Sequence, residues 1–135
     1  MSQYLLDSNV LSELWKKDPA ASVLDWLDSS EWLIPVVVIA EIQEGAEAAA
    51  SLARREEISR KLGEFLSEFS SLVMDWDAET ALVWARLRHS LEVKHQPQAL
   101  WDSLSDAMAI RHGIPVATRN SADFRHAATF NPWTT

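Results

Sequence analysis

Short apolar runs alternate along this chain with longer segments of helical periodicity. Apolar and β-branched residues bounded by turn formers predict strands at residues 3–6, 32–35, 72–74, 114–118 and 129–131. Apolar residues spaced three or four apart predict six helices, which cover residues 10–16, a segment that begins at 18, and residues 37–53, 52–69, 78–94 and 101–112.

Capping residues mark several of the predicted helix ends. Asp18 followed by Pro19 is expected to start the second helix, because Asp is a favoured N-cap and Pro fits the first turn. Asp77 is expected to cap the fifth helix, and Gly113 to end the sixth. The third helix is expected to continue almost directly into the amphipathic fourth helix.

Alternating strands and helices are typical of an α/β protein with a mainly parallel central sheet. The 135 residues are 47% apolar, and no repeat or linker divides them, so we predict one domain over residues 1–135. No run approaches the roughly 18 apolar residues of a membrane span. The N-terminus lacks the features of a signal peptide. We therefore expect a cytoplasmic protein without a membrane partner.

The charge of the chain is acidic and unevenly distributed. Twelve basic and 20 acidic residues give a net charge of −8, which argues against a tight nucleic-acid-binding module. Residues 1–80 carry 6 basic and 16 acidic side chains, whereas residues 81–135 carry 6 and 4. The first half therefore suits a basic protein partner. The absence of cysteine excludes disulfides and thiolate metal sites.

Acidic side chains occur where the strand ends of a parallel sheet would gather them. Asp7 follows the first predicted strand, and Asn120 and Asp123 follow the fourth. Asp102 opens the sixth helix, and Glu41 lies early in the third. Because ligands of open parallel sheets bind beyond the C-terminal ends of the strands, we expect the four acids to meet at one edge.

Carboxylates gathered at one edge repel one another, so we expect a cation to bind among them. Two like charges about 4 Å apart repel by roughly 4 kcal/mol at an effective dielectric constant near 20. Mg²⁺ and Mn²⁺ prefer oxygen ligands, and a metal held in this way polarises a phosphodiester. Taken singly, Asp7 and Asp102 also fit helix caps, and Asp123 fits an Asx turn. Glu41 interrupts an apolar stretch, where an unpartnered Glu is rare.

Taken in order, these segments resemble the PIN-domain toxins of the VapC family. The opening YLLDSNVLSEL resembles the family's first strand and its Asp-Thr-Asn turn. VVVIAEIQEGA resembles the second motif, a Glu four residues before a Gly, and DSLSDAMAIRHGIPVATRNSADF resembles the third and fourth motifs. NPW at 131–133 resembles the family's C-terminal end, so the resemblance spans essentially the whole chain.

The resemblance implies a three-layer α/β/α PIN-like fold and a toxin that hydrolyses RNA phosphodiester bonds with Mg²⁺, or with Mn²⁺ in its place. It implies that Asp7, Glu41 and Asp102 are catalytic metal ligands. The family's variable fourth position falls on Asn120, and Asp123 adds a further acid. The implied partners are a cognate antitoxin in a heteromeric complex, a second copy in a homodimer, and an RNA, with tRNA among the candidates.

Three further residues and one helical segment complete these expectations. Ser8 replaces the usual Thr and is expected to orient the metal ligands by hydrogen bonding, while Arg119 is the best candidate for contacting substrate phosphate. Asp106 stands where the family usually has Ala, one helical turn after Asp102, and we interpret it as a solvated helix residue rather than a further ligand. The helices over residues 46–69 are expected to contribute to an antitoxin groove.

Two other functions are compatible with parts of the sequence. An aspartyl-phosphate phosphatase of the haloacid-dehalogenase type also places Asp after its first strand, but it needs a second Asp where this chain has Asn9. A catalytically silent PIN-like module that binds protein or RNA is the stronger alternative, although the retained acids count against it. The sequence does not identify the RNA that is cut, the antitoxin or the number of metal ions.

Overall fold

Five parallel strands form the central sheet of the computed structural model, which describes residues 2–134. They are β1 (Gln3–Leu6), β2 (Glu31–Pro35), β3 (Val73–Met74), β4 (Val116–Ala117) and β5 (Thr129–Phe130). Their order across the sheet is β3-β2-β1-β4-β5, and every pair is parallel. The strand order reverses at β1, and crevices for ligands form at such a reversal point. The predicted α/β fold is confirmed.

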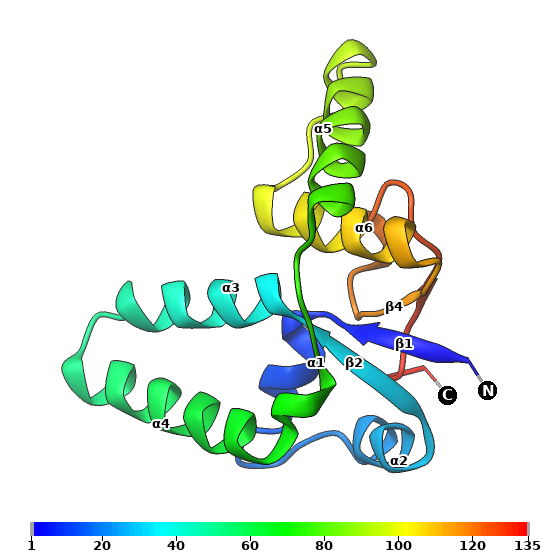
Figure 1. Ribbon diagram of the computed structural model, residues 1–135. Coiled ribbons are helices and arrows are strands. Elements are labelled where there is room, and N and C mark those ends of the chain that lie inside the picture. The colour runs from blue at the N-terminus through cyan, green and yellow to red at the C-terminus, as the bar shows by residue number, and fades with distance from the viewer. Residues whose placement is uncertain (1, 135) are drawn as a thin grey trace.

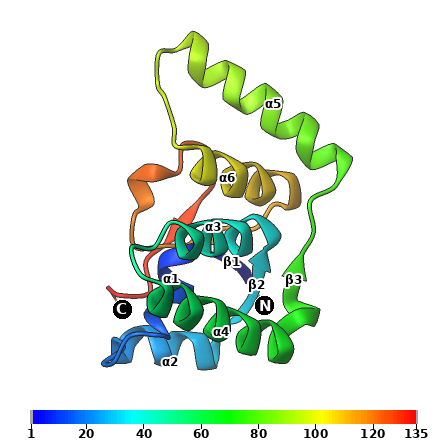
Figure 2. The same ribbon diagram turned by 90° about the vertical axis from the view of Figure 1, so that its left-hand side faces the viewer.

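Helices cover both faces of this sheet (Figures 1 and 2). They are α1 (Ser8–Glu13), α2 (Ala21–Ser29), α3 (Val36–Glu47), α4 (Leu52–Phe69), α5 (Ala78–Val93) and α6 (Leu100–His112). Two short 3₁₀ helices, η1 (Ser70–Leu72) and η2 (Ser121–Asp123), precede β3 and follow β4. The long helix α5 packs on the outside of α6 and lies away from the sheet (Figure 1).

Two apolar cores lie on opposite faces of the sheet, because successive residues of a strand point to opposite sides. Leu6 of β1 belongs to the core beneath α1, α2 and α4, where Trp26 stacks with Phe130. Leu5 belongs to the core beneath α6, together with Met108. This arrangement holds the C-terminal end of β1 between helices from both layers.

The middle of the chain differs from its predicted course. Helix α3 ends at Glu47 instead of continuing to about residue 53, and α4 returns antiparallel to it (Figure 1). The hydroxyl of Ser51 accepts a hydrogen bond from the backbone N–H of Arg54 at 3.1 Å, and this N-cap starts α4 as a separate helix. The alanines before Ser51 fit a helix as well as the residues of α3 do, so the periodicity of the sequence did not predict this break.

The start of α2 also differs from the prediction, whereas two other predicted caps are confirmed. Helix α2 begins at Ala21, and Asp18 does not cap it. No side chain caps α2, and the N–H of its N-cap residue Ala20 donates to Oε2 of Glu13 at 2.9 Å. Asp77 caps α5, and Gly113 ends α6 in the left-handed conformation. None of the helices within residues 2–134 has the length and apolar character that crossing a membrane requires.

Candidate active site

Asp7 lies at the C-terminal end of β1, where its carboxylate is almost completely buried. Its Oδ1 accepts the N–H of Ser8 at 2.8 Å, which starts α1. Its Oδ2 accepts the hydroxyl of Thr118 at 2.7 Å and the side-chain amide of Asn9 at 3.3 Å. Burial raises the pKa of Asp7, and the bonds from Thr118 and Ser8 oppose this rise.

Glu41 and Asp102 face Asp7 from two different helices. Burial, followed by the negative charge of Asp7, raises the pKa of Glu41 on α3 to about 7. Burial and the charges of Asp7 and Asp123 raise the pKa of Asp102 on α6 to about 6. The N-cap of α6 is Ala99, so the interpretation of Asp102 as a simple helix cap is wrong.

Asp123 completes the group from the loop between β4 and β5. It ends η2, is exposed, and its charge raises the pKa of both Asp7 and Asp102. The four acids predicted to meet therefore interact electrostatically at the strand ends of the sheet. They come from four separate elements, and we refer to Asp7, Glu41, Asp102 and Asp123 as the acidic cluster.

The other predicted site residues lie around this cluster in different ways. The nearby hydroxyl of Ser8 lowers the pKa of Glu41 and so favours the ionised form. Asn120 is exposed, and its backbone N–H donates to the Thr118 hydroxyl at 3.0 Å. The guanidinium of Arg119 lies over the ring of Trp133, 4.8 Å from its centroid, so this side chain is held beside the C-terminal segment.

Three polar residues near the site escaped prediction. Thr118 and Asn9 fix the carboxylate of Asp7, and Asn9 also donates to the Thr118 hydroxyl at 3.3 Å. The only sequence signal for Thr118 is a hydroxyl at the end of a predicted strand. Asp106 is not solvated as expected: it is 1% exposed and accepts backbone N–H groups of residues 125–127.

The donor set of the acidic cluster suits a hard divalent cation. Its side chains offer only carboxylate oxygens, which are the ligands that Mg²⁺ and Mn²⁺ prefer. In the part of the chain that the structure describes, no three Asp, Glu or His side chains already stand close enough to enclose an ion. Mutual repulsion opposes closer approach of the ionised acids, and a cation between them removes it. The residues therefore fit such an ion, provided that the carboxylates move closer together on binding.

Comparison with known proteins agrees with this arrangement. The family model described as PIN domain matches residues 4–129. The chain belongs to the PIN-domain family. Among curated relatives of this PIN domain, the VapC ribonuclease Y4jK of Sinorhizobium fredii is 33% identical, with 96% of each chain covered. Toxin FitB of Neisseria gonorrhoeae is 29% identical, covering 96% of this chain and 97% of the relative.

Solved structures share this fold. The crystal structure of FitAcB from Neisseria gonorrhoeae matches this PIN domain with a TM-score of 0.82 and 28% identity, covering 98% of this chain and 99% of that one. VapBC2 from Rickettsia felis, bound to a promoter DNA fragment, matches with a TM-score of 0.76 and 23% identity, covering 96% and 98%. The second match supports the fold alone.

The hydrogen bond between Thr118 and Asp7 leads to a first prediction. Thr118→Val keeps the shape of the side chain but removes the donor that favours the ionised carboxylate, so the pKa of Asp7 should rise further. An NMR titration of the aspartate carboxyl carbons in EDTA would measure the change. Thr80→Val is the matched control, because the buried Thr80 hydroxyl binds Asp77 at 2.6 Å, and it should raise the pKa of Asp77 alone.

The raised pKa values of the cluster predict how stability depends on pH without metal. Glu41 and Asp102 bind a proton more tightly in the folded chain, with pKa values of about 7 and about 6 against 4.5 and 3.8. Their stabilising contribution is therefore complete below about pH 4 and is lost as pH rises towards 7. Asp102→Asn should then be more stable than the wild type at pH 8, by about 1 kcal/mol after allowance for solvent screening.

Urea unfolding in EDTA at pH 4 and pH 8 tests this second prediction. The advantage of Asp102→Asn should disappear at pH 4, where the wild-type carboxyl is itself neutral. Asp25→Asn, which changes an exposed acid on α2, should show no such difference. A wild type at least as stable as Asp102→Asn at pH 8 would contradict the electrostatic account of the site.

Proposed function

We propose that this protein is the toxin of a type II toxin–antitoxin pair and acts as a Mg²⁺-dependent endoribonuclease, with Mn²⁺ able to replace Mg²⁺. The observation that carries the proposal is the acidic cluster, in which burial and mutual repulsion raise the pKa of Glu41 to about 7 and that of Asp102 to about 6. A relative that is 33% identical over almost the whole chain is named a ribonuclease.

The proposed ion is held by Asp7, Glu41 and Asp102, directly or through water, with Asp123 and the side-chain oxygen of Asn120 completing its surroundings. Such an ion lowers the pKa of a bound water and neutralises charge that develops on the phosphodiester. The reaction adds one water across one P–O bond of the RNA.

The chain's own residues prepare this site. Thr118 and Asn9 hold the buried Asp7 carboxylate in a fixed orientation. Ser8 supports the ionised form of Glu41. Arg119, an exposed cation directly before Asn120, is proposed to contact the phosphate backbone. Positive charge at this edge also offsets the repulsion between the RNA and an acidic protein.

A catalytically silent binding module is the alternative function. A protein that only binds has no use for acids whose repulsion destabilises the fold near neutral pH. The presence of Asp7, Glu41 and Asp102 at the family's motif positions therefore favours catalysis.

Cleavage of folded RNA is the direct test. The wild type should cut structured RNA when Mg²⁺ or Mn²⁺ is present and stop when EDTA is added. Asp7→Asn, Glu41→Gln and Asp102→Asn should each lower the rate by at least about 100-fold, because each removes a charge that neutralises the ion and orients the reaction. Asp25→Asn should retain full activity. Sequencing the cleaved ends would identify the RNA.

A different result would favour the silent module. If the wild type cut no RNA with either ion, and expression of the wild type and of Asp7→Asn were equally harmless in cells, the nuclease proposal would be wrong. A metal-dependent rise in melting temperature that Asp7→Asn removes would still establish the metal site by itself.

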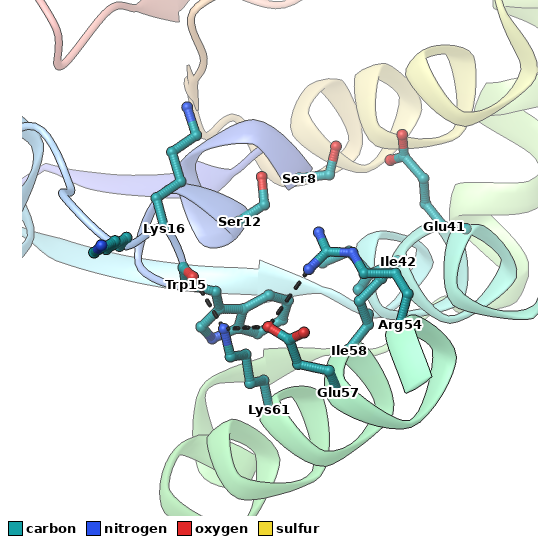
Figure 3. Close-up of a pocket in the computed structure, with 12 residues that line it drawn as sticks. Ser8, Ser12, Trp15, Lys16, Glu41, Ile42, Arg54, Glu57, Ile58 and Lys61 are labelled. Carbon is teal, nitrogen blue, oxygen red and sulfur yellow. Dashed lines mark hydrogen bonds and ion pairs between the residues drawn. The ribbon is translucent and has the colours of Figure 1, made fainter. Parts of the chain in front are cut away.

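The antitoxin is proposed to occupy the groove between α1, α3 and α4. A cavity of about 660 Å³ lies there, with Glu41 and Ser8 at one end and an apolar floor of Trp15, Ile42 and Ile58 (Figure 3). This position matches the groove expected from the helices over residues 46–69. A partner chain in the groove can place a basic side chain against Glu41 and so block the cluster.

Four basic side chains line this groove: Lys16, Lys17, Arg54 and Lys61. Lys61 contacts Glu57 at 3.1 Å and donates to the backbone oxygen of Trp15 at 3.0 Å, and Arg54 lies 3.5 Å from the same Glu57 (Figure 3). The apolar floor suits a protein segment with an apolar anchor as the occupant.

Hydrogen exchange tests the groove. Binding of the cognate antitoxin should protect amides of α3 and α4, relative to the free toxin. Ile58→Glu should weaken the complex by placing a charge on the apolar floor, while RNA cleavage by the free protein stays unchanged. Leu52→Ala, at an exposed position of α4 outside the cavity, is the control. Absence of protection in α3 and α4 would rule the groove out.

Homodimerisation remains part of the proposed assembly. Exposed large apolar side chains lie on the outer helices, Leu82 and Val93 on α5 and Leu100 and Ile110 on α6. Exposed apolar side chains of this kind suit a protein interface.

The proposed location of the toxin and its antitoxin is the cytoplasm.

A further inference from the structure

Asp106 is a buried acid on α6. Its hydrogen bonds come from the loop that follows β4 and from the side chain of Gln98. Its Oδ1 accepts the N–H of Ala127 at 2.8 Å, and its Oδ2 accepts those of Arg125 and His126, each at 3.1 Å. Three consecutive backbone N–H groups thus converge on one carboxylate, as they do on bound anions in other proteins. Here the anion is a side chain of α6.

The side chain of Gln98 connects this carboxylate to Asp123. Its amide nitrogen donates to Oδ2 of Asp106 at 3.2 Å and to the backbone oxygen of Asp123 at 2.8 Å. The same α6 carries Asp102, one turn before Asp106, and the charge of Asp123 raises the pKa of Asp102. Asp106 and Gln98 therefore tie the segment that bears Asp123 to the helix that bears Asp102.

The other hydrogen bonds of this loop lead to partners outside α6. Within η2, the N–H of Asp123 donates to the backbone oxygen of Asn120 and that of Phe124 to that of Ser121. The N–H of Arg119 donates to the side-chain oxygen of Asn9 at 3.4 Å, and the guanidinium of Arg125 donates to the backbone oxygen of Pro97 at 3.3 Å. The buried ring of Phe124 packs in the core that contains Met108 of α6. The bonds to Asp106 begin at the next residue and join the loop backbone directly to α6.

We propose that Asp106 is a positioning residue, which holds the loop so that Asp123 faces Asp102 and Asp7 in the acidic cluster. The inference rests on the proposed nuclease function, because it assigns a use to the orientation of Asp123. It also explains an acid at a position where the family pattern usually has Ala. The carboxylate contributes through the backbone it binds and does not act on the RNA.

A double-mutant cycle with Asp123 tests the proposal in the full-length protein. Asp106→Asn keeps the size of the side chain but presents an amide to the converging N–H groups. It should lower kcat for RNA by about 10- to 100-fold, the usual effect of losing a group that orients a metal ligand, with a much smaller change in KM. In an Asp123→Asn background the same substitution should change kcat by less than about twofold.

Ser103→Ala is the matched control on the same helix. Ser103 is buried, but its hydroxyl binds Trp84 and Arg88 of α5, on the side away from the loop. The control should lower the melting temperature without changing kcat. If the Asp106→Asn and Asp123→Asn losses multiply, or if Ser103→Ala lowers kcat as much as Asp106→Asn, Asp106 acts through general stability and the proposal is overturned.

Hydrogen exchange in EDTA provides a readout that needs no catalysis. The amides of residues 125–127 should exchange at least tenfold faster in Asp106→Asn than in the wild type, while those of β1 stay protected. Equal exchange in the two proteins would overturn the proposal even in an active enzyme. A wild type that cuts no RNA would instead refute the proposed function. Faster exchange in Asp106→Asn would then show that Asp106 holds the loop, but not that this serves catalysis.

Discussion

Repulsion between carboxylates gathered at the strand ends is the constraint on which the rest of this site depends. Parallel strands bring their C-terminal ends to one edge, and here that edge receives acids from β1, α3, α6 and η2. Burial disfavours the ionised form of each acid and the neighbouring negative charges add to this, so the pKa of Glu41 and that of Asp102 lie well above their ordinary values. A fold that maintains such a cluster loses stability as these acids ionise near neutral pH.

Two other buried acids of the same chain are matched by donors within the protein. Hydrogen bonds from Lys16 and the Ala20 N–H lower the pKa of Glu13. Asp106 is almost completely buried and accepts three backbone N–H groups. Within the cluster, Asp7 has internal donors as well, whereas the charge of Asp7 raises the pKa of both Glu41 and Asp102.

Different structural elements lie on the two sides of the cluster. Towards α1, α3 and α4, Glu41 opens onto the apolar-floored groove, so a partner bound there reaches the cluster directly. On the other side, the loop after β4 carries Asp123 and is tied to α6 through Asp106. Asp123 thus lies on a loop whose backbone is bonded to α6, whereas Asp7 lies at the end of the central strand.

Local sequence determined the strands, most helix ends and the order of the acids along the chain, because periodicity and capping depend on neighbouring residues. It also predicted that four acids share one edge of the sheet, and the charge of Asp7 does raise the pKa of Glu41 and Asp102. Only the tertiary structure decided the bond from Thr118 to Asp7, 111 residues away, the bond from the Ala20 N–H to Glu13, and the burial of Asp106. Each of these contacts depends on how distant elements pack. The sequence around an acid therefore does not predict which donors from elsewhere in the chain will bind its carboxylate.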